Sequence, residues 1–135
     1  MRRKLIDEKI KEIENHKYCN IKELICSYNI NLIRRSITEL AGIQSISINN
    51  NIIINDSLDP IQENFIILHE LGHILLHDSK ANCFIPLNYQ SKEEREANYF
   101  AIKMLMHREN ANLEEVAYLG VPIEELLKLR EIGML

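Results

Sequence analysis

The chain has 135 residues, of which 46% are hydrophobic and 27% are charged, and its formal net charge at pH 7 is −4. This length and composition are typical of one globular domain with a single buried core. The negative net charge argues against non-specific binding to DNA or RNA, which depends on a basic surface.

Segments that would direct the chain to a membrane or out of the cell are not recognisable. The apolar runs fall far short of the roughly 20 residues that a transmembrane helix needs, and the charged opening residues do not resemble a signal peptide. The odd number of cysteines, 3, suits reduced thiols in the cytoplasm. We therefore expect a cytoplasmic protein with no membrane partner and no direct binding to nucleic acid.

The first three predicted elements are helices. Residues 4–15 repeat isoleucine with helical spacing, which indicates an amphipathic helix. Residues 20–28 predict a second, shorter helix with Asn20 as its N-cap. Residues 31–40 predict a third helix, and Gly42 is a stop signal just beyond its end.

The period of the hydrophobic pattern changes between residues 45 and 55. Ser45-Ile-Ser-Ile48 alternates polar and apolar side chains, as a half-buried strand does. Asn49-Asn-Asn51 suits a turn, because Asn tolerates left-handed backbone conformations, and Ile52-Ile-Ile54 is a β-branched run. We expect a β-hairpin that lies on the helices, and hence a mostly helical α+β fold.

A long central helix is predicted over residues 60–77. Asp59 is a suitable N-cap, Pro60 suits the first helical position, and Gln62 stands where a capping-box partner belongs. Apolar side chains occur on several of its sides, so we expect the helix to be buried on more than one face.

The remaining chain predicts a loop and three helices. Residues 78–91 lack a clear period and are expected to form a loop, or an irregular edge strand at Cys83–Ile85, beside the substrate. Residues 92–107 carry one apolar stripe and predict another long helix. Two short helices follow, at residues 113–119 and 122–132.

The central helix contains Phe65-Ile-Ile-Leu-His69-Glu70-Leu-Gly-His73-Ile-Leu-Leu-His77, which includes a His-Glu-x-x-His motif. Positions i and i+4 share a helix face, so His69 and His73 can bind one metal ion together. Glu70 projects about 100° around the helix from His69 and can take a proton from water on a zinc ion. Without a metal, these buried polar groups of an apolar helix would each need another partner.

A catalytic zinc ion also needs a third protein ligand and an open position for water. His77 is a poor candidate, because it lies about 12 Å along the helix axis from His69. We expect His77 to be a helix-end histidine that interacts with the dipole at the C-terminal end.

Acidic residues at the start of the next helix are better candidates for the third ligand. Glu93, Glu94 and Glu96 are all available there. Glu94 and Asn98 share one helix face, so Asn98 can hydrogen bond to the second ring nitrogen of a ligand histidine. The residues themselves favour Glu94 and leave Glu93 and Glu96 open.

The motifs taken together resemble the ImmA/IrrE family of metallopeptidases. The resemblance rests on His69-Glu-Leu-Gly-His-Ile-Leu-Leu-His77, on Glu94-Arg-Glu-Ala-Asn-Tyr-Phe-Ala101 and on Met104-Leu-Met. It extends over about residues 45–135.

This resemblance implies a minimal zincin-like metalloprotease of the gluzincin type, with the hairpin beside the active-site helix. It implies Zn²⁺ bound by His69, His73 and Glu94, with Glu70 as the catalytic base. Many members are encoded by prophages or integrative elements and cleave a helix-turn-helix repressor of that element. Others belong to stress responses or toxin–antitoxin systems. Four side chains are candidates for the donor to the oxyanion: His77, Tyr89, Tyr99 and His107.

We therefore expect one domain over residues 1–135, made of N-terminal helices (1–44), a zincin core (45–107) and C-terminal helices (108–135). The expected function is that of a zinc-dependent endopeptidase that acts as an anti-repressor on a helix-turn-helix repressor. One alternative is a zinc-containing regulatory binding module of a repressor or toxin–antitoxin system that acts without proteolysis. Another is a DNA-binding regulator that uses the C-terminal helices, which the net charge disfavours.

Overall fold

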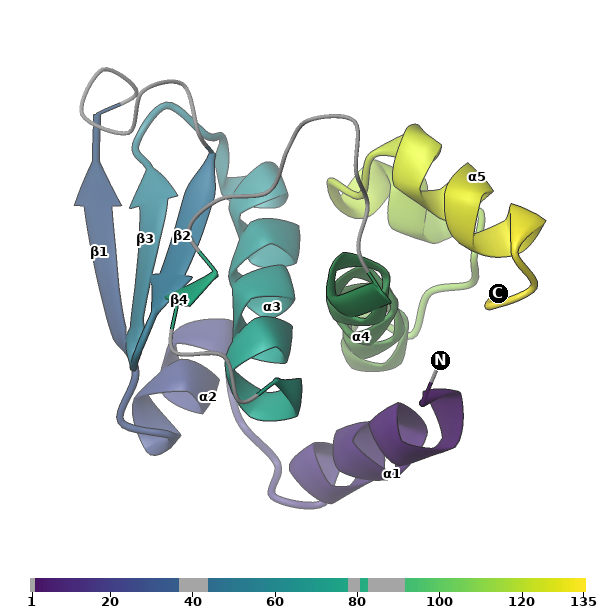
Figure 1. Ribbon diagram of the computed structural model, residues 1–135, viewed down its shortest axis with the longest axis horizontal. Coiled ribbons are helices and arrows are strands. Elements are labelled where there is room, and N and C mark those ends of the chain that lie inside the picture. Colours follow the sequence, from purple (N-terminus) through teal and green to yellow (C-terminus); the bar gives the residue numbers. More distant parts are fainter. Residues whose placement is uncertain (1, 37–43, 78–80, 83–91) are drawn as a thin grey trace.

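The structure is a computed structural model that describes residues 2–36, 44–77, 81–82 and 92–135 (Figure 1). The helices are α1 (Arg3–Glu14), α2 (Ile21–Ser27), α3 (Pro60–Leu76), α4 (Lys92–Arg108), the 3-10 helix η1 (Glu115–Leu119) and α5 (Ile123–Glu131). The strands are β1 (Asn31–Arg35), β2 (Ser45–Ile48), β3 (Asn51–Asn55) and β4 (Ala81–Asn82). These elements confirm the predicted α+β class.

The central helix α3 lies between the sheet and α4 (Figure 1). The strands follow the order β1-β3-β2-β4, in which β1 is parallel to β3 and β2 is antiparallel to both of its neighbours. On the other side of α4 lies α5, while η1 contacts both α3 and α4, and α1 packs against α4 near the end of α3 (Figure 1). This position explains why α3 is apolar around most of its circumference and buried along its middle.

The predicted start of α3 is confirmed. The Asp59 carboxylate accepts a hydrogen bond from the Gln62 backbone at 2.9 Å, and the Gln62 side chain accepts one from the Asp59 backbone at 3.4 Å. Pro60 occupies the first turn, where its missing N–H removes no helical hydrogen bond. The helix ends at Leu76, and His77 is its C-cap.

The predicted β-hairpin is also confirmed, and one of its faces is partly polar. Asn49 makes the turn with a left-handed backbone (φ 54°). Ser45 and Ser47 of β2 lie opposite Ile54 and Ile52 of β3, so these four side chains share the face that α3 covers. Because β2 contributes serines to this buried face, hydroxyl groups line the side of α3 that carries Glu70.

The helix predicted over residues 31–40 is wrong, because residues 31–35 form the parallel strand β1. Asn29 ends α2 in a left-handed conformation (φ 58°), and the Ile30 N–H bonds to the Ile25 carbonyl at 3.1 Å, as in a Schellman motif. The chain then leaves in an extended conformation. Leu32 and Ile33 pair with β3, a partner 20 positions later in the chain that local spacing does not reveal. The predicted stop at Gly42 lies outside the described residues.

The other predicted helices are confirmed as α1, α2 and α4, and Asn20 caps α2 by accepting a hydrogen bond from the Glu23 backbone at 2.8 Å. In the C-terminal pair, the first element is a 3-10 helix rather than an α-helix. The edge strand β4 pairs with β2, just before the segment Cys83–Ile85, which lies outside the described residues. Cys19 and Cys26 are free thiols. Within the described parts of the chain, no helix combines the length and apolar character needed to cross a membrane.

The closest approach of α3 and α4 occurs at Gly72. A Cβ atom at this position would lie 3.0 Å from Phe100 Cδ1 and 3.3 Å from the Ala97 Cα atom. Phe100 and Ala97 are fully buried and belong to α4, so neither has open space into which to move. Gly72 therefore sets the separation of the two helices.

We predict that Gly72→Val lowers the free energy of unfolding by about 1–3 kcal/mol, because the larger side chain forces α3 and α4 apart. Urea denaturation of the metal-free protein measures the effect. Asn64→Val, at an exposed position of the same helix, is the matched control and should cost only the difference in helix propensity, a few tenths of a kcal/mol. Equal losses in the two variants would contradict this role of Gly72.

Candidate metal centre

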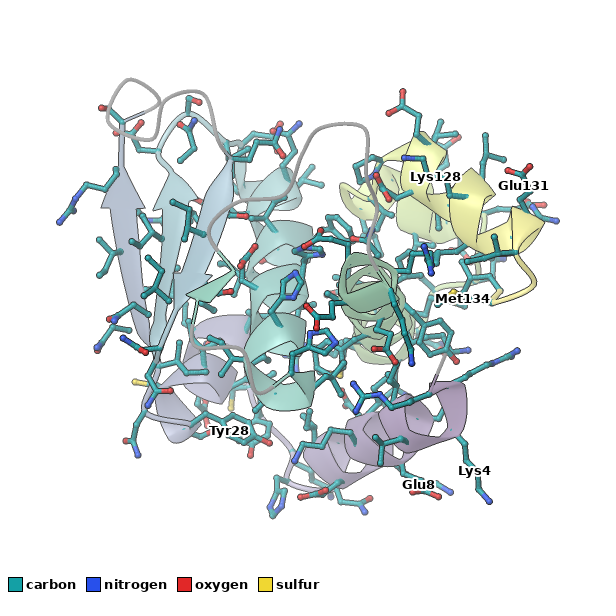
Figure 2. The ribbon with its side chains drawn as sticks, viewed as in Figure 1. Lys4, Glu8, Tyr28, Lys128, Glu131 and Met134 are labelled. Atoms are coloured by element: carbon teal, nitrogen blue, oxygen red, sulfur yellow. The ribbon has the colours of Figure 1, made fainter. Side chains whose placement is uncertain are left out.

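Three side chains of α3 converge on one buried point between α3 and α4. His69, Glu70 and His73 each offer one potential ligand atom within 4.8 Å of the others. The Nε2 atoms of the two histidines are 3.2 Å apart, as expected for positions i and i+4 on one face. Side chains that carry nitrogen and oxygen fill the space between the two helices (Figure 2).

The first turn of α4 supplies a carboxylate to this point. Glu94 Oε1 lies 2.6 Å from His73 Nε2, and Glu94 Oε2 lies 3.2 Å from His69 Nε2. Of the other acids considered as ligands, Glu93 is exposed, and Glu96 is bonded to different partners. Among these three acids, Glu94 is the one that contacts both histidines.

The electrostatics of the cluster formed by His69, Glu70, His73 and Glu94 favour a positive charge. Burial lowers the pKa of His69, but the hydrogen bond to Glu94 and the charges of Glu70 and Glu94 outweigh it, so this pKa lies above 6.5. Burial raises the pKa of Glu94, but hydrogen bonds from His69 and His73 outweigh it and hold this pKa well below its ordinary range. A group of this kind can bind a metal cation in place of a proton.

The donor set fits a metal ion of the zinc type. Two imidazole nitrogens and one carboxylate oxygen are the protein ligands of several catalytic zinc sites, which leave one position open. Tetrahedral ligands at ordinary zinc distances are about 3.3 Å apart, and the Nε2 atoms of His69 and His73 are separated by 3.2 Å. The residues present therefore suit Zn²⁺ in chemical type, and the two histidine nitrogens suit it in spacing.

Glu70 is held beside the cluster by one of its two oxygens. Ser45 Oγ donates a hydrogen bond to Glu70 Oε1 at 3.0 Å. Glu70 Oε2 is buried and has no hydrogen-bond partner among the described residues. One carboxylate oxygen is thus oriented while the other stays available. The contact of Ser45 with Glu70 was not predictable from local spacing, although the alternation of β2 does place a polar side chain at that position.

Asn98 lies one helical turn after Glu94, as predicted, and is buried. Its amide nitrogen donates to Glu125 Oε2 of α5 at 2.8 Å. Its side chain also raises the pKa of His69, yet His69 Nδ1 has no hydrogen-bond partner of normal geometry among the described residues. The hydrogen bond from Asn98 to a ligand imidazole therefore stays a prediction.

His77 lies at the end of α3 and outside the cluster of possible ligands, but it is buried rather than solvated. Its Nδ1 atom is 3.3 Å from His73 Nδ1, and its Nε2 atom is 3.2 Å from Glu96 Oε1. Burial lowers the pKa of His77. Burial raises the pKa of Glu96, but its hydrogen bonds with Arg2 outweigh this and hold it below 4.5. No sequence spacing could have linked Arg2 to Glu96.

Two of the candidate oxyanion donors are engaged with α1. The Tyr99 hydroxyl is buried, donates to Asp7 at 2.6 Å and accepts from Arg3 at 3.3 Å. Burial and the hydrogen bond to Asp7 raise the pKa of Tyr99 to about 12. His107 is exposed and lies 3.5 Å from Glu14. Tyr89 is outside the described residues.

Comparisons with known proteins identify the family to which the chain belongs. The sequence profile of the IrrE N-terminal-like domain, which defines a family of peptidases, matches residues 27–131. The chain is also 31% identical to "Uncharacterized immunity region protein 2" of Bacillus phage phi105, over 137 aligned residues that cover 91% of this chain and 86% of the phage protein. No solved structure matches the chain at a significant level. The matched region contains α3, α4 and every member of the cluster.

We predict that the contribution of Glu96 to stability is lost in acid. Because its pKa in the folded protein lies below 4.5, the contribution is complete above pH 4.5 and disappears as the pH falls through the folded value. Urea denaturation of the metal-free protein should therefore show Glu96→Gln to be less stable than wild type at pH 7, with a gap that narrows in acid. Glu93→Gln, at an exposed position on the same helix, is the control. A gap for Glu96→Gln that is constant with pH would contradict the prediction.

Proposed function

Because the chain belongs to the IrrE N-terminal-like domain family of peptidases, the ImmA/IrrE family, we propose that it is a zinc-dependent endopeptidase. Its proposed substrate is a helix-turn-helix repressor of a prophage or integrative element, so that the protein acts as an anti-repressor. One observation carries the proposal: two histidines and Glu94 converge, and beside them one buried oxygen of Glu70 has no partner among the residues that the structure describes.

In this proposal His69, His73 and Glu94 hold the zinc ion. When bound, zinc lowers the pKa of a water molecule to about 7 and polarises the substrate carbonyl. The cluster is buried between α3 and α4, which keeps the three donors oriented before the metal arrives. Asn98 is the proposed hydrogen-bond partner of a ligand histidine, with Glu125 fixing its amide group.

Glu70 is the proposed catalytic base and acid. Its free oxygen, Oε2, accepts a proton from the attacking water and then delivers that proton to the amine of the leaving peptide. Ser45 holds the other oxygen by a hydrogen bond at 3.0 Å, which keeps Oε2 from rotating away. A side chain that moves a proton twice in one cycle benefits from such a fixed orientation.

The proposed partner follows from the family and from the similar phage protein, whose name refers to an immunity region. Repressors that maintain phage immunity act on DNA in the cytoplasm, so we also propose a cytoplasmic location. The protein would recognise the repressor rather than its operator, because the net charge of −4 disfavours contact with DNA. We propose that residues 1–135 act as one domain.

An alternative is a zinc-containing regulatory module that binds a repressor or toxin without cutting it. The partly unpaired Glu70 weighs against this function, because a structural zinc site closes its fourth position and needs no base. The two functions differ in one observable. The peptidase shortens the repressor on a denaturing gel unless a chelator is present, whereas the binding module leaves the repressor intact.

We predict that Glu70→Gln retains zinc but loses repressor cleavage by a factor of about 10² or more, since the amide cannot accept the proton. His73→Ala should lose both zinc and cleavage, because it removes a ligand. Purified protein is incubated with the helix-turn-helix repressor proposed as its substrate, and zinc is quantified by atomic absorption. Cleavage by Glu70→Gln at the wild-type rate would falsify the proposed mechanism.

We predict that Glu94→Gln alone, among the three changes Glu93→Gln, Glu94→Gln and Glu96→Gln, fails to retain one equivalent of zinc. Glu94 is the acid that contacts both histidines, and Glu93 is exposed. Glu96→Gln keeps an oxygen that can still accept the hydrogen bond from His77. Zinc stoichiometry after gel filtration tests the assignment. Full occupancy in Glu94→Gln would require another residue as the third ligand.

A further inference from the structure

A chain of hydrogen-bonding groups connects His73 to the first residues of the protein. His73 Nδ1 lies 3.3 Å from His77 Nδ1, and His77 Nε2 lies 3.2 Å from Glu96 Oε1. Arg2 donates to both oxygens of Glu96, from its backbone nitrogen, Nε and Nη2, at 3.1 to 3.2 Å. The mechanism proposed above uses His73 but neither His77, Glu96 nor Arg2.

The hydrogen atoms in this series of hydrogen bonds can be assigned step by step. The Glu96 carboxylate only accepts hydrogen bonds, so His77 Nε2 must donate. A neutral imidazole carries one hydrogen, which leaves His77 Nδ1 as an acceptor. His73 Nδ1 must then be the donor across the 3.3 Å contact. At its other nitrogen, Nε2, His73 lies 2.6 Å from Glu94 Oε1 and 3.2 Å from His69 Nε2. Without metal a hydrogen on Nε2 bonds to Glu94, and a bound metal ion would take the place of that hydrogen.

Arg2 fixes the far end of this series of hydrogen bonds in space. Besides its bonds to Glu96, its Nη2 atom donates to the Leu76 carbonyl at 3.1 Å. Leu76 is the last residue of α3 and Glu96 belongs to α4, so one guanidinium joins the two helices that carry the cluster. The Glu96 side chain is only 1% exposed, so its ion pair with Arg2 forms where little water reaches the carboxylate.

We propose that His77, Glu96 and Arg2 are positioning residues that hold His73 in the tautomer and orientation needed to bind the metal. Through Arg2, the segment that begins α1 would contribute to metal affinity without touching the ion. This inference rests on the proposed function in one respect, namely that His73 is a metal ligand. Hydrogen-bond partners of ligand histidines typically change metal affinity by about 10- to 100-fold.

The experiment measures zinc affinity of the full chain by competition with a chromophoric chelator. We expect Arg2→Ala and His77→Phe each to weaken zinc binding by about 10- to 100-fold. Arg3→Ala is the matched control, because Arg3 is the next residue along α1 and bonds to Tyr99 instead of Glu96. It should bind zinc as wild type does.

His77→Gln separates hydrogen bonding from packing. A glutamine amide has both a donor and an acceptor, so it can bridge Glu96 and His73, whereas phenylalanine only fills the space. We expect His77→Gln to bind zinc more tightly than His77→Phe. The absorption spectrum of the Co²⁺-substituted protein supplies a second readout, since a misoriented His73 alters the ligand field. Thermal unfolding without metal identifies any variant that is simply unfolded.

Each outcome has a defined meaning. Wild-type zinc affinity in folded His77→Phe overturns the proposal, and equal losses in His77→Phe and His77→Gln overturn it as well. Wild-type affinity in Arg2→Ala overturns the part that extends to α1, and thermal unfolding without metal shows that the variant compared is folded. Failure of the wild-type protein to bind zinc would instead refute the proposed function.

Discussion

The close contact between α3 and α4 is the constraint on which the site depends. Neither helix carries the whole group of proposed ligands, because α3 supplies two histidines and α4 supplies Glu94, which contacts both of them. The absence of a side chain at Gly72 lets the helices approach until a Glu94 oxygen lies 2.6 Å from His73. The sheet on the opposite side of α3 and the helices around α4 keep the pair together. The rest of the fold therefore serves mainly to hold two helices at one separation.

Three glutamates near this contact show how the surroundings determine the role of a carboxylate. Glu94 faces two imidazoles and is held as an anion by them. Glu96, two positions later, points to Arg2 and His77 and forms a buried ion pair. Glu70 is held by a serine hydroxyl at one oxygen and has no partner at the other among the described residues. The three roles proposed for them, a metal ligand, a positioning residue and a catalytic base, thus belong to one residue type.

The features that depend on neighbouring residues were predictable from the sequence. The His-Glu-x-x-His spacing, the Asp59 capping box and the hairpin at Asn49 all depend on residues within a few positions of each other. The features that escaped prediction depend on partners far away in the chain. β1 became a strand because β3 pairs with it, and Ser45 and Arg2 reach the site only after the chain has folded. Local periodicity contains no information about such partners.

The two outer helices, α1 and α5, are both joined to α4 beside the cluster. Arg2, at the start of α1, bonds to Glu96, and Glu125 of α5 bonds to Asn98. A cation that binds only the assembled cluster stabilises every contact that the assembly requires. Metal binding would therefore disfavour the detachment of α1 and α5, although neither helix carries a proposed ligand. By the same linkage, a partner that pulled either helix away would weaken the hold on the metal. Metal affinity and the attachment of α1 and α5 would therefore be thermodynamically coupled, so that a change in one changes the other.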